Sequence, residues 1–438
     1  MHDIARVQAV IDLVSSIEEA MATQKLPADA IISSYFRTRR YAGSKDRRFI
    51  IERVYQILRE REVLVWMLKT ANEKTITARA LFLASAIKHG DSLEGFMVAH
   101  AHGPSPITAE EQALIESLKL ININDIPAFI KANIPEWARV KFETRFAGNA
   151  AQEAEALNQR AEVHVRVNTI KSDRKTTREA LEKEGIECVE GRYAPTSLVL
   201  SQAAALQNLP LYRDGWVEMQ DEAAQIASVL VDAKPNHKVV DLCAGAGGKS
   251  LAIAAFMQND GMIFATDINQ RRLKDLEKRA KRAGASIIRP EAVEKDGDDR
   301  VRAFEEYTQA MDRVVVDAPC SGSGTWRRNP DQRWRFGTAD IEALQKVQSQ
   351  LLTEGAALCK VGGRLIYMTC SLFEDENEGI IDTFLNNHPA YRIVDWKSLW
   401  GAGNSPLKTA AKREDFLLLT PLQHSTDGFF IAILERFD

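Results

Sequence analysis

The chain has 438 residues, of which 45% are hydrophobic and 27% charged, and its formal net charge is −4. This length is enough for two or three domains with separate cores, and the slightly acidic balance excludes a protein that binds polyanions through an evenly basic surface. The five cysteines are an odd number without a CxxC pair, which excludes a secreted disulfide scaffold, so we expect a cytoplasmic protein without a metal site. No apolar stretch reaches the length of a membrane span, and we expect no membrane partner.

Residues 1–147 are expected to form an all-α domain. Apolar residues recur every three or four positions in residues 4–21 and 47–70, which is the pattern of amphipathic helices. Thr108 and Glu111 have the spacing of a capping box that begins a further helix. The basic stretch 37–61 is open to two interpretations, a local patch for a polyanion or a solvated helix face in which Glu balances Arg.

Residues 148–213 are expected to form a small α+β subdomain. Two short β-like runs, VHVRVNT at 163–169 and SLVLS at 197–201, lie on either side of the amphipathic stretch 176–186. This order predicts strands around one helix.

Residues 214–438 are expected to form an α/β domain of the Rossmann-like type. A helix is expected over 216–231. Strands are then expected at 238–245, 261–268, 311–319 and 362–371, and helices at 248–258, 269–284 and 341–359. Such alternation favours a parallel, doubly wound sheet. The β-rich stretch 427–436 is expected to be an antiparallel edge strand.

The stretch VVDLCAGAGGKS, residues 239–250, is a strand that runs into a glycine-rich turn and a helix. Such a turn lets a ligand approach the backbone closely, but a dinucleotide fold and a ligand-free turn use similar sequences. Asp241 begins the turn, and Asp267 ends the next strand, where a carboxylate can hold ribose hydroxyls. This pairing favours a nucleoside cofactor without a pyrophosphate, S-adenosyl-L-methionine (SAM). For the adenine contact, Glu291 and Asp296 are both possible.

Two cysteines follow predicted strands, Cys320 in DAPCSGSG and Cys370 in MTCS. The carboxyl ends of parallel strands meet at one crevice, so we expect both thiols to point into one pocket beside the cofactor. A thiolate that adds to C6 of cytosine makes C5 nucleophilic enough to take a methyl group, and an acid such as Asp317 offsets the charge that builds on the ring. Lys249 is of interest because a nearby cation favours a thiolate. The other cysteines, Cys188, Cys243 and Cys359, are expected to be packing residues.

Five motifs occur in order along the chain: GWVEMQDEAAQIA, DLCAGAGGKS, DAPCSGSGTWRRNPD, YMTCSLFEDENE and DGFFIA. In these motifs the chain resembles the Nop/Sun family of RNA cytosine-C5 methyltransferases, and within it the bacterial B-type enzymes for 16S ribosomal RNA, which carry a NusB-like helical domain. The resemblance extends from Asn158 to the C-terminus. The first third resembles the NusB-like domain more loosely, chiefly through YAGSKDRRFIIERVYQILR.

The resemblance implies roles for the residues of these motifs. Cys370 would attack C6, Cys320 would assist C5 deprotonation or breakdown of the adduct, and Asp317 and Lys249 would contact the base. Ala246 stands where the family usually has proline, and Ser250 where it often has threonine. The candidate cofactor residues are Asp241, Cys243, Ala244, Gly245, Ala246, Gly247, Gly248, Lys249, Asp267, Arg272, Glu291 and Asp317.

The expected partner is RNA, most simply ribosomal RNA, bound by a monomer. The segment 158–210 resembles a small RNA-binding subdomain, and the stretch RRNPDQRWR, 327–335, could add a wall to an RNA groove. Its arginines would pair phosphates, and Trp326, directly before the stretch, or Trp334 within it would either stack on a base or pack in a core. The helical domain could bind RNA or protein, or act as a folding cap.

Three other functions stay open on the sequence alone. The same motifs occur in enzymes that methylate tRNA or other ribosomal RNA sites. DNA cytosine-C5 methylation shares the covalent chemistry, but the cysteine of the MTCS motif is unexpected there. A non-catalytic RNA-binding or ribosome-assembly factor would not need Asp267, Asp317, Cys320 and Cys370 together.

Overall fold

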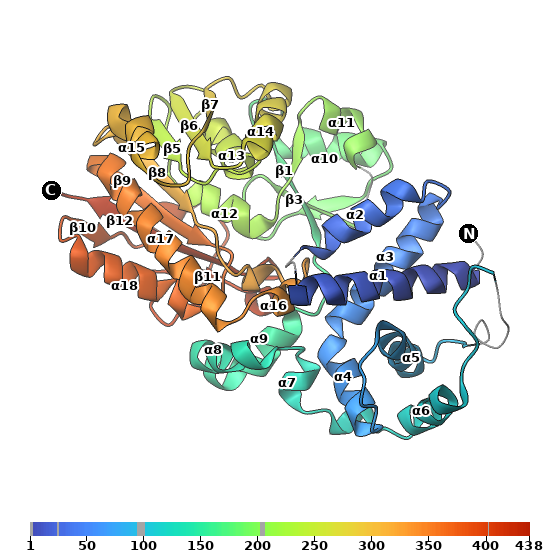
Figure 1. The fold of residues 1–438 in the computed structure, drawn as a ribbon. Helices are drawn as coiled ribbons and strands as arrows, with labels where there is room; N and C mark the ends of the chain where they lie inside the picture. Colours follow the sequence, from blue (N-terminus) through green and yellow to red (C-terminus); the bar gives the residue numbers. More distant parts are fainter. Residues whose placement is uncertain (1–2, 24–25, 94–100, 202–205, 402) are drawn as a thin grey trace. The chain divides into compact units, whose positions relative to one another are not determined.

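The computed structural model describes residues 3–23, 26–93, 101–201, 206–401 and 403–438. Its elements form two compact units (Figure 1). The first unit contains residues 1–160 and 325–338, and the second contains 161–324 and 339–438. The three-domain division with limits at 147 and 213 stays a prediction.

The first unit is helical, as predicted for the first third of the chain. Thr108 accepts a hydrogen bond from the Glu111 N–H at 3.2 Å, and the Glu111 carboxylate accepts one from the Thr108 N–H at 3.0 Å, so the predicted capping box is confirmed. Its helices are α1 (Asp3–Thr23), α2 (Ala28–Thr38), α3 (Ser44–Arg59), α4 (Arg61–Thr70), α5 (Ala78–His89), α6 (Ala109–Lys119), α7 (Ala128–Lys131), α8 (Glu136–Phe146), α9 (Ala150–Ala156) and α16 (Gln332–Arg335).

The segment 325–338 packs into this helical unit although it lies far along the chain. The Trp326 ring is 1% exposed and lies 6.3 Å from the Trp137 ring and 5.8 Å from the Phe142 ring. The buried Arg333 guanidinium donates to Asn133 O at 2.9 Å and to Leu157 O at 3.0 Å. Core packing is therefore the correct alternative for Trp326. The expectation that arginines of this stretch pair RNA phosphates is wrong for Arg333, because its guanidinium is fully buried and donates to groups of the helical unit.

Trp334 is partly buried in the same unit. Its ring packs against the hydrophobic core of the helices, and its Nε1 donates to the Glu62 carboxylate at 3.1 Å. The Arg61 guanidinium lies 5.3 Å from the centre of the ring. These contacts favour packing over base stacking for Trp334 as well.

The second unit contains a small antiparallel sheet of order β2-β3-β1-β4. Its strands are β1 (Val163–Val167), β2 (Cys188–Glu190), β3 (Ser197–Leu200) and β4 (Val217–Met219), with helices α10 (Arg174–Lys183) and α11 (Pro210–Arg213). The predicted α+β segment is thus confirmed. The helix expected from Trp216 is wrong at its start, because 217–219 pair with β1 and helix α12 (Glu222–Leu230) begins only after the Asp221 cap.

The larger sheet of the second unit has eight strands in the order β10-β12-β9-β8-β5-β6-β7, with β11 beside β12. The pairs from β9 to β7 are parallel, as expected, and β12 is antiparallel to its neighbours. The strands are β5 (Lys238–Asp241), β6 (Met262–Asp267), β7 (Ile288–Ala292), β8 (Met311–Asp317), β9 (Cys359–Thr369), β10 (Tyr391–Ile393), β11 (Leu417–Leu419) and β12 (Phe429–Arg436). The expected edge position of 427–436 is wrong, because β12 lies between β9 and β10 and is buried over most of its length.

Strand order changes direction at β5, which leads to β6 and β7 on one side and has β8 and β9 on the other. Such a switch point opens a crevice at the carboxyl ends of the strands. The helices of this part are α13 (Gly248–Phe256), α14 (Gln270–Ala283), α15 (Asp298–Phe304), α17 (Thr338–Leu358), α18 (Glu378–Asn387), α19 (Lys397–Trp400) and α20 (Pro421–His424).

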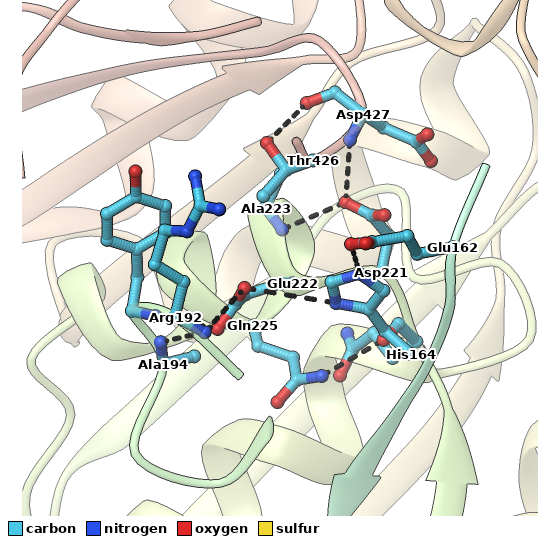
Figure 2. Close-up of polar contacts among 12 residues, drawn as sticks. Glu162, His164, Arg192, Ala194, Asp221, Glu222, Ala223, Gln225, Thr426 and Asp427 are labelled. Carbon is cyan, nitrogen blue, oxygen red and sulfur yellow. Dashed lines mark hydrogen bonds and ion pairs between the residues drawn. The ribbon is translucent and has the colours of Figure 1, made fainter. Parts of the chain in front are cut away.

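The N-terminus of α12 joins three segments of the second unit (Figure 2). The Asp221 carboxylate accepts hydrogen bonds from the N–H groups of Ala223 at 2.9 Å and Asp427 at 3.0 Å. The Glu222 carboxylate accepts from the N–H groups of Arg192, Tyr193 and Ala194 and lies 3.9 Å from the His164 ring of β1. These bonds anchor the small sheet and the turn before β12 to one helix end.

Candidate active site

A cavity of about 420 Å³ lies at the switch point of the larger sheet. It is lined by Leu242, Cys243, Ala244, Gly245, Ala246, Asp267, Ile268, Arg272, Lys295, Asp296, Arg300, Asp317, Pro319, Val347, Gln350 and Leu351. Its volume suits a small-molecule cofactor. Seven of the twelve predicted cofactor residues line this cavity, together with Val347 and Leu351 of α17: Cys243, Ala244, Gly245, Ala246, Asp267, Arg272 and Asp317.

The backbone of the glycine-rich turn has a shape that requires glycine at two positions. Gly245 has φ 56° and Gly247 φ 82°, both in the left-handed region. A Cβ atom at Gly247 would also lie 2.5 Å from Cγ of Leu276 in α14. The turn is held from outside by Arg279, which donates to Ala246 O at 2.6 Å. The sequence pattern located the turn but not this support from α14.

Two aspartates stand on opposite sides of the turn. Asp267, at the end of β6, lines the cavity, and its carboxylate accepts hydrogen bonds from the N–H groups of Gly245 at 2.9 Å and Asn269 at 2.7 Å. Asp241 is 1% exposed and accepts a hydrogen bond from the Ser250 hydroxyl at 2.7 Å. Asp267 thus lines the cavity, whereas Asp241, also predicted as a cofactor residue, is not among the residues that line it and binds Ser250 at the start of α13.

The candidates for the adenine contact lie apart. Asp296 and Arg272 line the cavity at the switch point, whereas Glu291 lines a second cavity of about 410 Å³ with Phe264 and Tyr307. The position of Asp296 therefore favours it over Glu291 for this contact. Gly247, Gly248 and Lys249 continue from the turn into the start of α13.

Lys249 and Asp317 form a close ion pair, with Nζ 2.5 Å from Oδ2. The Lys249 ammonium also lies 4.9 Å from the centre of the Phe429 ring. Burial disfavours the charged form of this lysine, but the Asp317 carboxylate outweighs burial and raises the pKa of Lys249. The pair therefore supplies one fixed cation and one carboxylate at the edge of the cavity.

Cys320 and Cys370 lie side by side, as predicted, with 3.4 Å between their Sγ atoms. Cys370 directly follows β9, and Cys320 lies three residues beyond the end of β8. The hydrogen bond to Cys370 and burial raise the pKa of Cys320 well above its ordinary value. A thiolate on Cys370 and the Lys249 ammonium attract each other. The two thiols therefore differ in their surroundings: Cys320 holds its proton more tightly than an ordinary cysteine, and Cys370 is the one near the Lys249 charge.

The remaining cysteines lie outside this pair. Cys188 and Cys359 are buried, and Cys243 is partly buried and lines the cavity. Burial, followed by the charge of Asp241, raises the pKa of the Cys243 thiol. A neutral thiol at this position can contact a ligand but does not act as a nucleophile.

No described helix is long and apolar enough to cross a membrane. Among the described side chains, no group of three or more His, Cys, Asp or Glu could hold a metal ion.

The switch-point cavity, the glycine-rich turn after β5 and the order of the larger sheet define a Rossmann-like methyltransferase fold. The sequence profile of the family described as 16S rRNA methyltransferase RsmB/F matches residues 228–435. A second profile, described as a Methyltr_RsmF/B-like, ferredoxin-like domain, matches residues 134–207.

Relatives and solved structures agree with these matches. A probable ribosomal RNA small subunit methyltransferase B from Synechocystis is 29% identical over 89% of this chain and 91% of the relative. A probable ribosomal RNA small subunit methyltransferase B from Bacillus subtilis is 31% identical over 69% of this chain and 66% of the relative. The crystal structure of PH0851 superposes with a TM-score of 0.76 at 26% identity and covers 98% of each chain. The chain belongs to the RsmB/F family of methyltransferases.

Proposed function

We propose that this protein methylates C5 of a cytosine in RNA, with SAM as the methyl donor and 16S ribosomal RNA as the substrate. The observation that carries the proposal is the pair of thiols, Cys320 and Cys370, at 3.4 Å beside the Lys249–Asp317 ion pair. Attack at C6, followed by loss of the C5 proton, needs one nucleophilic thiolate and a second group to complete the reaction. Relatives named ribosomal RNA small subunit methyltransferase B support the RNA substrate.

The residues of the switch-point cavity fit SAM. A carboxylate, Asp267, faces the cavity beside backbone of the glycine-rich turn, and Ile268, Val347 and Leu351 supply apolar contacts. We assign Asp267 to the ribose hydroxyls, the turn from Cys243 to Ala246 to the methionine part, and Asp296 to the adenine. When bound, SAM supplies an electrophilic methyl group.

The first half of the proposed reaction belongs to Cys370. Its thiolate, attracted by the Lys249 ammonium, attacks C6 of the target cytosine, and the electron pair of the C5=C6 bond makes C5 nucleophilic. Negative charge then builds at N3 and O2 of the ring. The Lys249–Asp317 pair offsets this charge and orients the base.

The second half of the reaction belongs to Cys320. After methylation C5 must lose its proton, and the bond between C6 and the Cys370 sulfur must break. The C5 proton passes to solvent water, its electron pair re-forms the C5=C6 bond, and the Cys370 sulfur leaves as a thiolate. Cys320 lies next to that sulfur, and we assign to it the stabilisation of the departing thiolate by its S–H group. The cytosine must also leave its stack to reach the thiols, at a cost of a few kcal/mol that single-stranded RNA reduces.

The test is methyl transfer from labelled SAM to 16S ribosomal RNA, followed by identification of 5-methylcytosine. Cys370→Ala should abolish both methylation and the covalent protein–RNA adduct. Cys320→Ala should form the adduct and release it slowly, so that the adduct accumulates. Cys359→Ala, a buried thiol of β9, is the control with unchanged activity.

Three outcomes would reject the proposal or part of it. Full activity in Cys370→Ala would reject the nucleophile assignment. Labelling of tRNA but not of ribosomal RNA would reject the substrate. A methyl group found on another atom would reject the cytosine-C5 chemistry.

A further inference from the structure

The two cysteine turns share a buried carboxylate, Glu376, which is not among the predicted site residues. Ser321 and Ser371 each follow a cysteine directly, and both hydroxyls donate to Oε2 of Glu376 at 2.5 Å. The Ser321 N–H donates to the other oxygen of Glu376 at 2.9 Å. The side chains of all three residues are at most 1% exposed. One carboxylate thus holds both turns.

Glu376 is itself fixed by neighbouring elements. Gln348 of α17 donates from Nε2 to Oε1 of Glu376 at 3.0 Å and to Pro319 O at 2.9 Å. The Tyr367 hydroxyl donates to the Glu376 carbonyl at 2.7 Å. The four hydrogen bonds to the carboxylate come from neutral groups, and only a carboxylate has enough acceptor sites for all of them. The position of Glu376 is therefore fixed by buried side chains of α17 and β9.

Asn377 fixes the Cys370 turn next to Glu376. Its Oδ1 accepts a hydrogen bond from the Thr369 hydroxyl at 2.6 Å, and its Nδ2 donates to Ser371 O at 2.9 Å. These two bonds bracket Cys370 on both sides but do not reach the turn of Cys320. The Glu376 carboxylate, in contrast, accepts from a side chain of each turn, and the Ser321 and Ser371 hydroxyls also lie 3.2 Å from each other.

The charge of Glu376 also acts on one thiol of the pair. It is one of the groups that raise the pKa of Cys320, after the hydrogen bond and charge of Cys370 and burial. Burial, and after it the nearby Glu376 charge among others, raises the pKa of Tyr367. On the other side, the Lys249 ammonium attracts a thiolate on Cys370. The two fixed charges therefore act on different thiols: the Glu376 carboxylate acts on Cys320, and the Lys249 ammonium acts on Cys370.

We propose that Glu376 is a positioning residue that fixes the distance between Cys320 and Cys370 and places a negative charge beside Cys320. The inference rests on the proposed function, because it states which thiol is free to attack the base. Glu376 does not touch the substrate. It acts through Ser321 and Ser371, and its charge disfavours a thiolate on Cys320.

The first test uses two variants of the full chain to separate the effect of the length of the Glu376 side chain from the effect of its charge. Glu376→Gln keeps the length of the side chain but removes its charge, and Glu376→Asp keeps the charge but shortens the reach. We expect Glu376→Gln to lower kcat at least about tenfold with little change in KM for RNA, because small displacements of reacting groups carry such costs. Glu374→Gln, in the same turn but paired with Lys412, is the matched control with wild-type kcat.

The second test reads the thiol directly and needs no turnover. In Cys370→Ala, alkylation of Cys320 by iodoacetamide is followed against pH by mass spectrometry, with and without Glu376→Gln. We expect the midpoint of alkylation to fall by about one pH unit when the charge is removed, and to stay in place with Glu376→Asp. An unchanged midpoint would overturn the charge role, and wild-type kcat in both Glu376 variants would overturn the positioning role.

Two measurements distinguish a failure of the Glu376 role from a misfolded variant and from a failure of the proposed function. Thermal unfolding shows whether a variant is folded, and if Glu376→Gln is not, Ser321→Ala and Ser371→Ala each remove one donor to the carboxylate and should lower kcat instead. If the wild-type protein does not methylate cytosine, the proposed function fails, but the alkylation midpoints still decide the charge role of Glu376.

Discussion

Asp241 is an ionisable residue that the fold buries at the start of the cofactor turn. Burial is the largest effect on its carboxyl group, the charge of Asp317 adds to it, and the pKa rises from an ordinary 3.8 to about 6. Because the folded pKa lies above the unfolded one, this group contributes stability that is fully present below the unfolded pKa. That contribution is lost as the pH rises through the folded pKa.

Asp241→Asn should therefore stabilise the protein at neutral pH. The amide oxygen can still accept the Ser250 hydrogen bond, whereas the cost of a buried charge disappears. We expect the free energy of unfolding to increase by about 1–3 kcal/mol at pH 7.5 and to match the wild type at pH 4. Urea unfolding between pH 4 and 8 measures this difference, and a difference that does not vary with pH would contradict the assignment.

Lys249 and Asp317 are expected to act as one unit. Lys249→Met removes the cation that offsets charge on the ring and leaves the Asp317 carboxylate without the ammonium 2.5 Å away. We expect single-turnover methylation to slow on the order of 100-fold, the scale for losing one preorganised donor. Asp317→Asn combined with Lys249→Met should be no slower than the worse single variant, since residues that act together are not additive. Independent, multiplying losses would show separate roles.

At the scale of elements, two turns meet in a contact without room for a side chain. The Gly324 N–H donates to Cys370 O at 2.9 Å, and the Gly428 N–H donates to Gly324 O at 2.8 Å. A Cβ atom on Gly324 would lie 2.2 Å from the Gly428 oxygen. The turn after Cys320, the turn after Cys370 and the start of β12 therefore lock together.

Gly324→Ala should push this contact apart and shift the Cys320 turn. We expect a lower melting temperature and a loss of methylation larger than the loss of SAM binding, because the thiols and not the cofactor cavity are displaced. Gly403→Ala is the matched control, since nothing lies within 4 Å of a Cβ atom there. Calorimetry and equilibrium SAM binding check the two effects. Equal behaviour of both variants would show that the contact tolerates a methyl group.

The sequence predicted those elements that depend on local hydrophobic periodicity, and those site residues that lie at the ends of predicted strands. The glycine-rich turn, the Asp267 strand end and the adjacency of Cys320 and Cys370 all follow from alternating strands and helices. Strand β4 was missed because its three residues pair with β1, about fifty positions earlier, which no local periodicity reveals. Glu376 was missed for the same reason, since two of its partners, Ser321 and Gln348, lie 55 and 28 positions away in the sequence and only Ser371 is local.

At the scale of the whole molecule, the chain interleaves its two compact units. The segment 325–338 leaves the second unit directly after the Cys320 turn, contributes Trp326 and Arg333 to the helical unit, and returns through α17. Its arginines and tryptophans resembled a nucleic-acid surface because composition does not distinguish a solvated guanidinium from one that donates to buried carbonyls. Their partners, such as Asn133 and Leu157, belong to the first third of the chain.

This interleaving predicts how a truncated protein behaves. A chain that begins at residue 161 lacks the partners of Trp326 and Arg333. Side chains of the segment 325–338 that are buried in the full chain would then be exposed to solvent. Exposed apolar surface of this kind promotes association. We expect the fragment 161–438 to aggregate on expression, and the same fragment with 325–338 replaced by a flexible Gly/Ser linker to be soluble and to bind SAM.

Trp326→Ala in the full chain is the matching point variant. It removes a large buried side chain that packs on Trp137 and Phe142, and we expect about 3–5 kcal/mol of destabilisation. Because the packing lies in the helical unit, hydrogen exchange should accelerate first in α8 and its neighbours, before the strands around β5. A soluble, folded 161–438 fragment with its native segment, or uniform exchange in Trp326→Ala, would show that the segment does not depend on the helical unit.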